Sequence, residues 1–166
     1  MSRYYPHTEY AEEQPYAKTI LTAHVLDRSF QTGAVFGLAT GTLRSLIKRR
    51  PIAGTILSST GYGALMGFAV MIPVIPMYMS GKTDIEWKDR SWRLLENEGQ
   101  KEVDDWSSVG FVGGALATAR SEAFRQARSG KFVRLMGGGA LGDLLGVMGY
   151  MVWRYGVHQG KWPQKS

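Results

Sequence analysis

The sequence predicts an all-α membrane protein, a bundle of four transmembrane helices with an amphipathic loop between the second helix and the third. Two observations support this prediction. Long stretches carry no charge, although 20% of the 166 residues are charged and the net charge is +6. Glycine contributes 21 residues, nearly all inside those apolar stretches, where it would weaken the helices of a soluble protein. The predicted four-helix membrane domain covers residues 29–154.

The second predicted span, 53–79, has the clearest pattern. It lies in a run of 31 uncharged residues from Pro51 to Gly81, and a bilayer core of about 30 Å needs only about 20 helical residues. We expect Pro73 and Pro76 to kink or end this helix. The other three spans are shorter or are interrupted by single charges, and we place them at about 29–47, 106–126 and 134–153.

The charges between the spans favour four crossings over two or three. The central loop, 82–105, has eight acids and five bases, a charge of −3, whereas the other two connections are basic. Four spans place both basic connections on one side of the membrane, and the acidic loop and both termini on the other. Short loops rich in Lys and Arg stay on the side from which a protein is inserted. The basic residues, which could bind lipid head groups or act only as topology signals, are Lys48, Arg49, Arg50, Arg125, Arg128, Lys131 and Arg134.

Every predicted span carries glycines at a spacing of four residues, which places them on one helix face. Small residues let a second backbone approach closely, and this approach drives helix association in lipid. We therefore expect a tightly packed bundle, in which the stripes serve internal packing or leave one stripe outward for another membrane protein or a lipid chain. The stripe glycines are Gly33, Gly37, Gly41, Gly63, Gly67, Gly110, Gly114, Gly138, Gly142 and Gly146.

Asp143 is the one acid inside a predicted span, where a charge is costly and normally paired. We expect an interhelical ion pair with Arg44 or Arg120, or a protonated, neutral carboxyl. A proton or substrate relay is the alternative, but no second intramembrane acid or histidine continues such a path.

No motif in the sequence predicts catalysis. Gly137–Gly142 fits the G-x-G-x-x-G pattern, but no strand is expected before it and no acid follows Asp143, so we reject a dinucleotide site. The chain has no cysteine and three scattered histidines, which leaves no thiolate nucleophile or zinc-ligand pattern. We expect no catalytic, cofactor-binding or metal-binding residue, and no nucleic acid or small-molecule substrate.

The polar flanks suggest anchoring and contacts. Residues 1–28 hold four acids and three bases, unlike a presequence or a secretory signal, and Tyr16–Arg28 could form an interfacial helix. The acidic loop carries Trp87, Trp92 and Trp106, which could anchor at the interface or dock a partner. Residues 155–166 form a polar tail.

The acidic loop also carries a resemblance. The run from Ile85 to Gln100, IEWKDRSWRLLENEGQ, followed by EVDDW at Glu102–Trp106, resembles the NUXM family of fungal accessory subunits of respiratory complex I. The glycine-striped spans and basic connections resemble the wider mitochondrial inner-membrane superfamily, which also includes protein-translocase channel subunits. The resemblance covers the loop and its two flanking spans, about half of the chain.

This resemblance implies a non-catalytic subunit of the membrane arm of NADH:ubiquinone oxidoreductase that supports assembly and stability. It implies contacts with other membrane-arm subunits and with phospholipid such as cardiolipin. The expected location is the mitochondrial inner membrane, with the basic loops in the matrix and the termini and acidic loop in the intermembrane space. A translocase channel subunit is the alternative, and a small transporter is a weaker one, but the few polar residues within spans form no continuous track.

Overall fold

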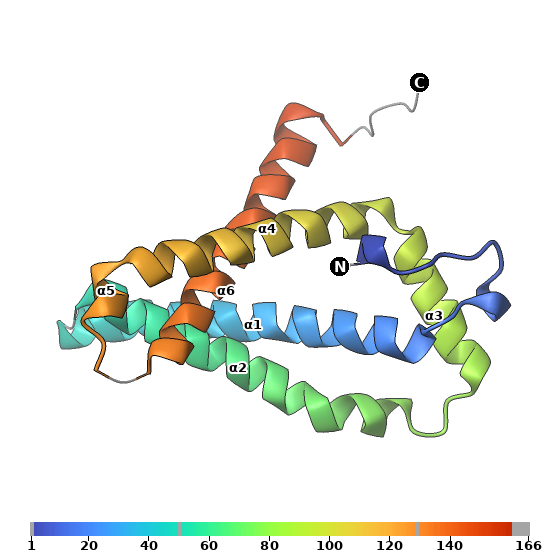
Figure 1. Cartoon of the computed structure of the whole chain (residues 1–166), viewed down its shortest axis with the longest axis horizontal. Helices are drawn as coiled ribbons and strands as arrows, with labels where there is room; N and C mark the ends of the chain where they lie inside the picture. Colours follow the sequence, from blue (N-terminus) through green and yellow to red (C-terminus); the bar gives the residue numbers. More distant parts are fainter. Residues whose placement is uncertain (1, 50, 129, 161–166) are drawn as a thin grey trace.

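In the computed structural model the chain is all-α, with no strand among the residues that the structure describes, 2–49, 51–128 and 130–160 (Figure 1). Four long helices dominate: α1 (Ala17–Lys48), α2 (Ile52–Met79), α4 (Glu98–Arg120) and α6 (Lys131–Met151). The shorter elements are η1 (Ser2–Tyr4), η2 (Ala11–Glu13), α3 (Asp84–Glu96), α5 (Glu122–Arg125) and the π-helical turn η3 (Val152–Val157).

The long helices form two antiparallel pairs, α1 with α2 and α4 with α6. Glycines of α1 face successively earlier residues of α2 from Gly67 back to Ile56, and α4 and α6 are paired in the same way. Helix α6 crosses the other long helices and also packs against α2 (Figure 1). The α1–α2 connection and the segment with α5 lie at one end of the molecule, and α3 lies with the N-terminal segment at the other.

Helix α1 begins much earlier than the predicted first span. It runs for 32 residues from Ala17, so Tyr16–Arg28 is not a separate interfacial helix but the first part of the same helix. The reason lies in the sequence, because no Gly or Pro interrupts residues 17–28. Ile20 in this first part is buried, with 2% of its surface exposed.

Helix α2 matches the predicted second span to within one residue at its start. It continues through Pro73 and Pro76 and ends at Met79, so neither proline terminates it. The chain turns only at Gly81, whose φ of 80° is favourable for glycine.

The acidic loop contains the expected amphipathic helix, α3. Thr83 and Glu86 form a capping box at its start, an arrangement that pairs two otherwise unbonded backbone amides. Helix α4 then begins at once, because the Asn97 side chain accepts a hydrogen bond from the Gln100 amide at 3.2 Å. It starts eight residues before the predicted third span and ends at Arg120 rather than at residue 126, since Ser121 caps the short α5.

Within the described part of the chain, two helices are long and apolar enough, by length and composition, to cross a membrane, Ile52–Met79 and Lys131–Val157. The second comprises α6 and the π-helical turn that continues it, so it begins three residues before the predicted fourth span and ends after it. Of the predicted polar tail 155–166, residues 161–166 lie outside the described part of the chain.

Candidate functional site

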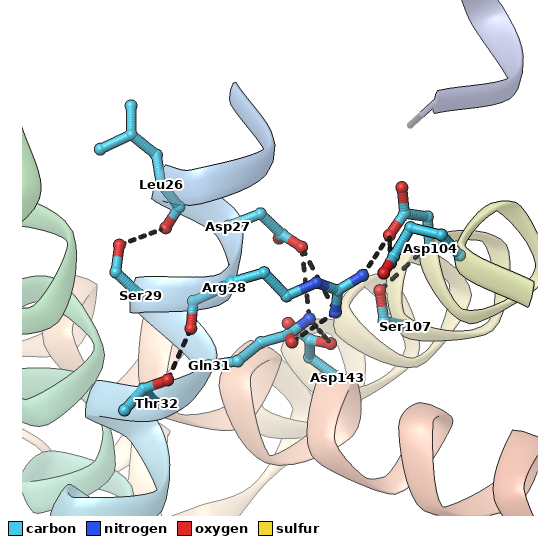
Figure 2. Close-up of polar contacts among 10 residues, drawn as sticks. Leu26, Asp27, Arg28, Ser29, Gln31, Thr32, Asp104, Ser107 and Asp143 are labelled. Atoms are coloured by element: carbon cyan, nitrogen blue, oxygen red, sulfur yellow. Dashed lines mark hydrogen bonds and ion pairs between the residues drawn. The ribbon is translucent and has the colours of Figure 1, made fainter. Parts of the chain in front are cut away.

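A cluster of polar side chains joins α1, α4 and α6 in the interior (Figure 2). At its centre is Gln31 of α1, whose side-chain amide donates to Asp143 Oδ1 of α6 at 3.0 Å and to Asp27 Oδ2 at 3.3 Å. Asp143 is 3% exposed. One amide group therefore bridges two carboxylates from two helices, and a buried carboxylate needs such donors.

The second half of the cluster links α1 to α4. Arg28 donates to Gln31 Oε1 at 2.6 Å and forms a short ion pair with Asp104. Asp104 is 5% exposed and also accepts from the Gln100 side chain at 2.9 Å. The Arg28 side chain, 27% exposed, thus places a positive charge among Asp27, Asp104 and Asp143, and hydrogen bonds to charged groups are the stronger ones.

The predicted ion pair of Asp143 with Arg44 or Arg120 is wrong. Asp143 instead accepts from Gln31, and Arg28 is the basic side chain whose charge acts on it. The register explains the difference. Arg44 lies 13 residues beyond Gln31, about 20 Å along the helix. Arg44 and Arg120 are both exposed, near the C-terminal ends of α1 and α4. Gln31 was visible in the sequence as a polar residue in an apolar span, but its partners were not.

The glycine stripes of α1 and α2 face each other. A Cβ added to Gly33 or Gly37 would overlap the backbone of α2, and one added to Gly63 or Gly67 would overlap that of α1. A Cβ on Gly41 would lie 2.9 Å from the Ser59 Cβ. These glycines therefore allow the backbone contact that the sequence predicts.

The stripes of α4 and α6 pack in the same way. Gly110 packs against the backbone of Gly142, and Gly114 packs against that of Gly138. Gly146 packs against the backbone of Trp106. All ten predicted glycines therefore serve packing within the chain, and the alternative of an outward stripe is wrong.

Sequence reasoning missed a third contact that joins the two helix pairs. Gly61 of α2 and Gly137 of α6 lie against each other, so that a Cβ on either would overlap the partner backbone. Gly139 is covered by the Phe111 ring, 2.5 Å from an added Cβ. Gly137 had been considered only as part of a rejected nucleotide motif, and Gly61 falls outside the four-residue spacing of Gly63 and Gly67.

The basic residues lie at the end of the molecule with the α1–α2 and α4–α6 connections (Figure 1). Arg134 is half-buried and donates to the Ala123 carbonyl oxygen. Arg50 lies outside the described residues. The exposed members of the predicted set are Lys48, Arg49, Arg125, Arg128 and Lys131.

The tryptophans have different environments. Trp92 of α3 is held within the chain, because its indole N–H donates to the Thr8 carbonyl at 2.9 Å and its ring stacks on His7. The neighbour of the amphipathic helix is thus the chain's own N-terminal segment. Trp106 is 41% exposed, with its ring centroid 6.5 Å from that of Trp153, and Trp87 is half-buried.

Two pairs further fix the N-terminal segment. Arg3 pairs with Asp105 at 2.8 Å, and Lys88 donates to the Glu12 carbonyl at 2.9 Å. At the start of α3, the backbone N–H of Thr83 donates to Glu86 at 2.8 Å, and this bond, with help from Lys82, holds the pKa of the Glu86 carboxyl below its ordinary value.

The described residues contain no group of three or more His, Asp or Glu side chains that could hold a metal ion. No protein-family model matches the chain, and neither a curated protein nor a solved structure is significantly similar to it.

Proposed function

We propose that this chain is a four-span protein of the mitochondrial inner membrane and a non-catalytic accessory subunit of the membrane arm of respiratory complex I. The observation that carries the membrane part of the proposal is the exposed apolar surface of α2. Met66 and Met77 are 65% and 75% exposed on a helix without a single charge. Apolar patches of this extent are rare on soluble monomers.

The packing of the long helices supports four spans rather than two. Helix α1 lies antiparallel to α2, and α4 lies antiparallel to α6, along contacts between glycine backbones. At 32 and 23 residues, α1 and α4 are about 48 and 35 Å long, which exceeds the bilayer core of about 30 Å. Three polar side chains of α1 are bonded inside the protein, since Thr40 and Thr42 donate to their own helix and Gln31 donates to Asp143.

The ends of the molecule support one orientation. Both basic connections lie together at one end, and the acidic helix α3 lies with the N-terminal segment at the other (Figure 1). By the positive-inside rule the basic end belongs in the matrix, and the acidic end in the intermembrane space.

The assignment to complex I depends on the resemblance of the acidic segment. In the proposed role the chain contacts other membrane-arm subunits and phospholipid. Because the stripe glycines are used internally, these contacts involve larger exposed side chains such as Phe36 and Val109, which are 68% and 75% exposed.

The deciding experiment is native gel separation of mitochondrial membranes solubilised in a mild detergent, followed by mass spectrometry of the band that contains this chain. We expect co-migration with complex I subunits, and deletion of the chain should reduce assembly of the membrane arm. Recovery with protein-import subunits would instead support the translocase alternative and refute this proposal.

A further inference from the structure

A pocket lined in part by two arginines lies at the basic end of the bundle, between α1, α2 and α6. Its volume is about 400 Å³, which is within the range of small-molecule sites. The side chains that define its chemistry are Arg44, Thr55, Ser58, Tyr62 and Arg134, and none of its described lining residues is acidic.

Two arginines from different helices line this pocket, Arg44 from α1 and Arg134 from α6. The guanidinium of Arg134 lies over Gly54, where an added Cβ would be 3.7 Å from both terminal nitrogens. Its hydrogen bond to the Ala123 carbonyl oxygen holds it there. Arginine presents its donors in a fork that matches two oxygens of a phosphate.

The start of α2 adds neutral donors. Pro51 is the N-cap and makes no side-chain cap bond, so the N-cap side chain does not occupy the first backbone amides of the helix. Thr55, Ser58 and Tyr62, whose side chains carry hydroxyl groups, line the same pocket. Two cations, hydroxyl donors and the positive end of a helix dipole all favour an anion.

We infer that this pocket binds a phosphate group, and that its source is the head group of an anionic phospholipid. The lipid source follows from the surface beside the pocket. Tyr62 and Met66 are 63% and 65% exposed, and as residues four apart they share one helix face. An acyl chain can lie along this face while the phosphate meets Arg44 and Arg134. The lipid source depends on the proposed membrane placement, but the phosphate site itself does not depend on complex I.

The test compares two double variants of the purified full-length chain. Arg44→Gln/Arg134→Gln removes both pocket cations, and Lys48→Gln/Arg49→Gln removes the same charge from exposed positions outside the pocket lining. Native mass spectrometry from detergent mixed with phosphatidylglycerol measures retained lipid. We expect about a tenfold loss of affinity in the first variant and less than about a twofold change in the second.

Additional arms identify the ligand and control for folding. Phosphatidylcholine should be retained far less than phosphatidylglycerol, whereas competition by inorganic phosphate alone would assign the site to a free anion and overturn the lipid source. Arg44→Gln alone leaves the Arg134 bond to Ala123 intact and should still weaken retention. Equal losses in the two double variants, or equal retention of the two lipids, would overturn the site. Because the measurement uses isolated protein, its failure is distinct from a failure to co-migrate with complex I.

Discussion

Gly113 and Gly114 are neighbours in α4 that occupy opposite environments. A Cβ added at Gly113 meets nothing within 4 Å, whereas one at Gly114 would overlap the Gly138 carbonyl oxygen and lie 2.9 Å from the Cα of Gly142. The two substitutions Gly113→Ala and Gly114→Ala therefore add the same methyl group to the same helix. Only the second tests backbone contact between α4 and α6.

The size of the effect follows from this geometry. Carbon atoms in favourable contact are about 3.5–4.0 Å apart, so Gly114→Ala requires α4 and α6 to separate by about 1 Å. Overpacking of this kind costs about 1–3 kcal/mol. Gly113→Ala has no such cost and gains up to about 1 kcal/mol from helix propensity.

The assay is the free energy of unfolding of each purified variant in mixed micelles, followed by tryptophan fluorescence during denaturant titration. Gly114→Ala should lower the midpoint, while Gly113→Ala should match or exceed the wild type. Equal stabilities of the two variants would refute the inference that glycine contact holds α4 against α6.

Three further substitutions test other parts of the structure. Asp104→Ala removes the Arg28–Asp104 ion pair and leaves Arg28 only its bond to Gln31 and a 3.9 Å contact with Asp27, and it should cost about 3 kcal/mol of unfolding free energy, the low end for buried pairs, whereas the neighbouring Asp105→Ala removes an exposed pair with Arg3 and should cost at most about 1 kcal/mol; similar losses in both would contradict the cluster. Thr60→Val replaces a fully buried hydroxyl without a hydrogen-bond partner in the described structure and should raise the melting temperature, since an unpaired buried donor costs about 1–3 kcal/mol; a lower melting temperature would show that this hydroxyl is bonded. The pKa of the Glu86 carboxyl is lowered from its ordinary value of 4.5. The carboxylate therefore gives its full stabilisation to α3 above pH 4.5, and this stabilisation is lost as the pH falls through the lowered pKa. The protection of the α3 amides, measured as the exchange rate relative to the intrinsic rate at the same pH, should therefore fall over this range in the wild type but not in Glu86→Gln, and identical protection profiles would argue against the capping box.

The sequence predicts the helices better than their ends, for identifiable reasons. The uncharged run from Pro51 to Gly81 locates α2 closely, because the helix begins and ends within two residues of the ends of that run. Hydropathy does not predict the starts of α1 and α4, since the polar residues that precede the apolar part of each helix are helical as well. At α4 the start depends on Asn97, whose capping bond to Gln100 reflects local backbone geometry rather than hydropathy.

The candidate site was less predictable because it depends on register between distant segments. A spacing of four residues identifies the glycine faces, but nothing in that spacing pairs Gly61 with Gly137. Gln31 and Asp143 are 112 positions apart, and only the tertiary crossing brings them into contact. The indole of Trp92 binds the carbonyl of Thr8, 84 positions away in the sequence. The sequence does not reveal this internal contact, and Trp92 could therefore be interpreted as a residue that docks a partner.

The distribution of the polar cluster between the two helix pairs has a consequence for biogenesis. In the proposed membrane placement, the α1–α2 hairpin can close on its own glycines as soon as it enters the bilayer, but Arg28 and Gln31 obtain Asp104 and Asp143 only after α4 and α6 have arrived. Until then Arg28 and Gln31 have only each other and Asp27 of the same helix as partners, and lipid supplies no replacement for the two missing carboxylates. A truncated or stalled chain would thereby differ chemically from the finished one, which would give membrane proteases and chaperones a basis for distinguishing the two.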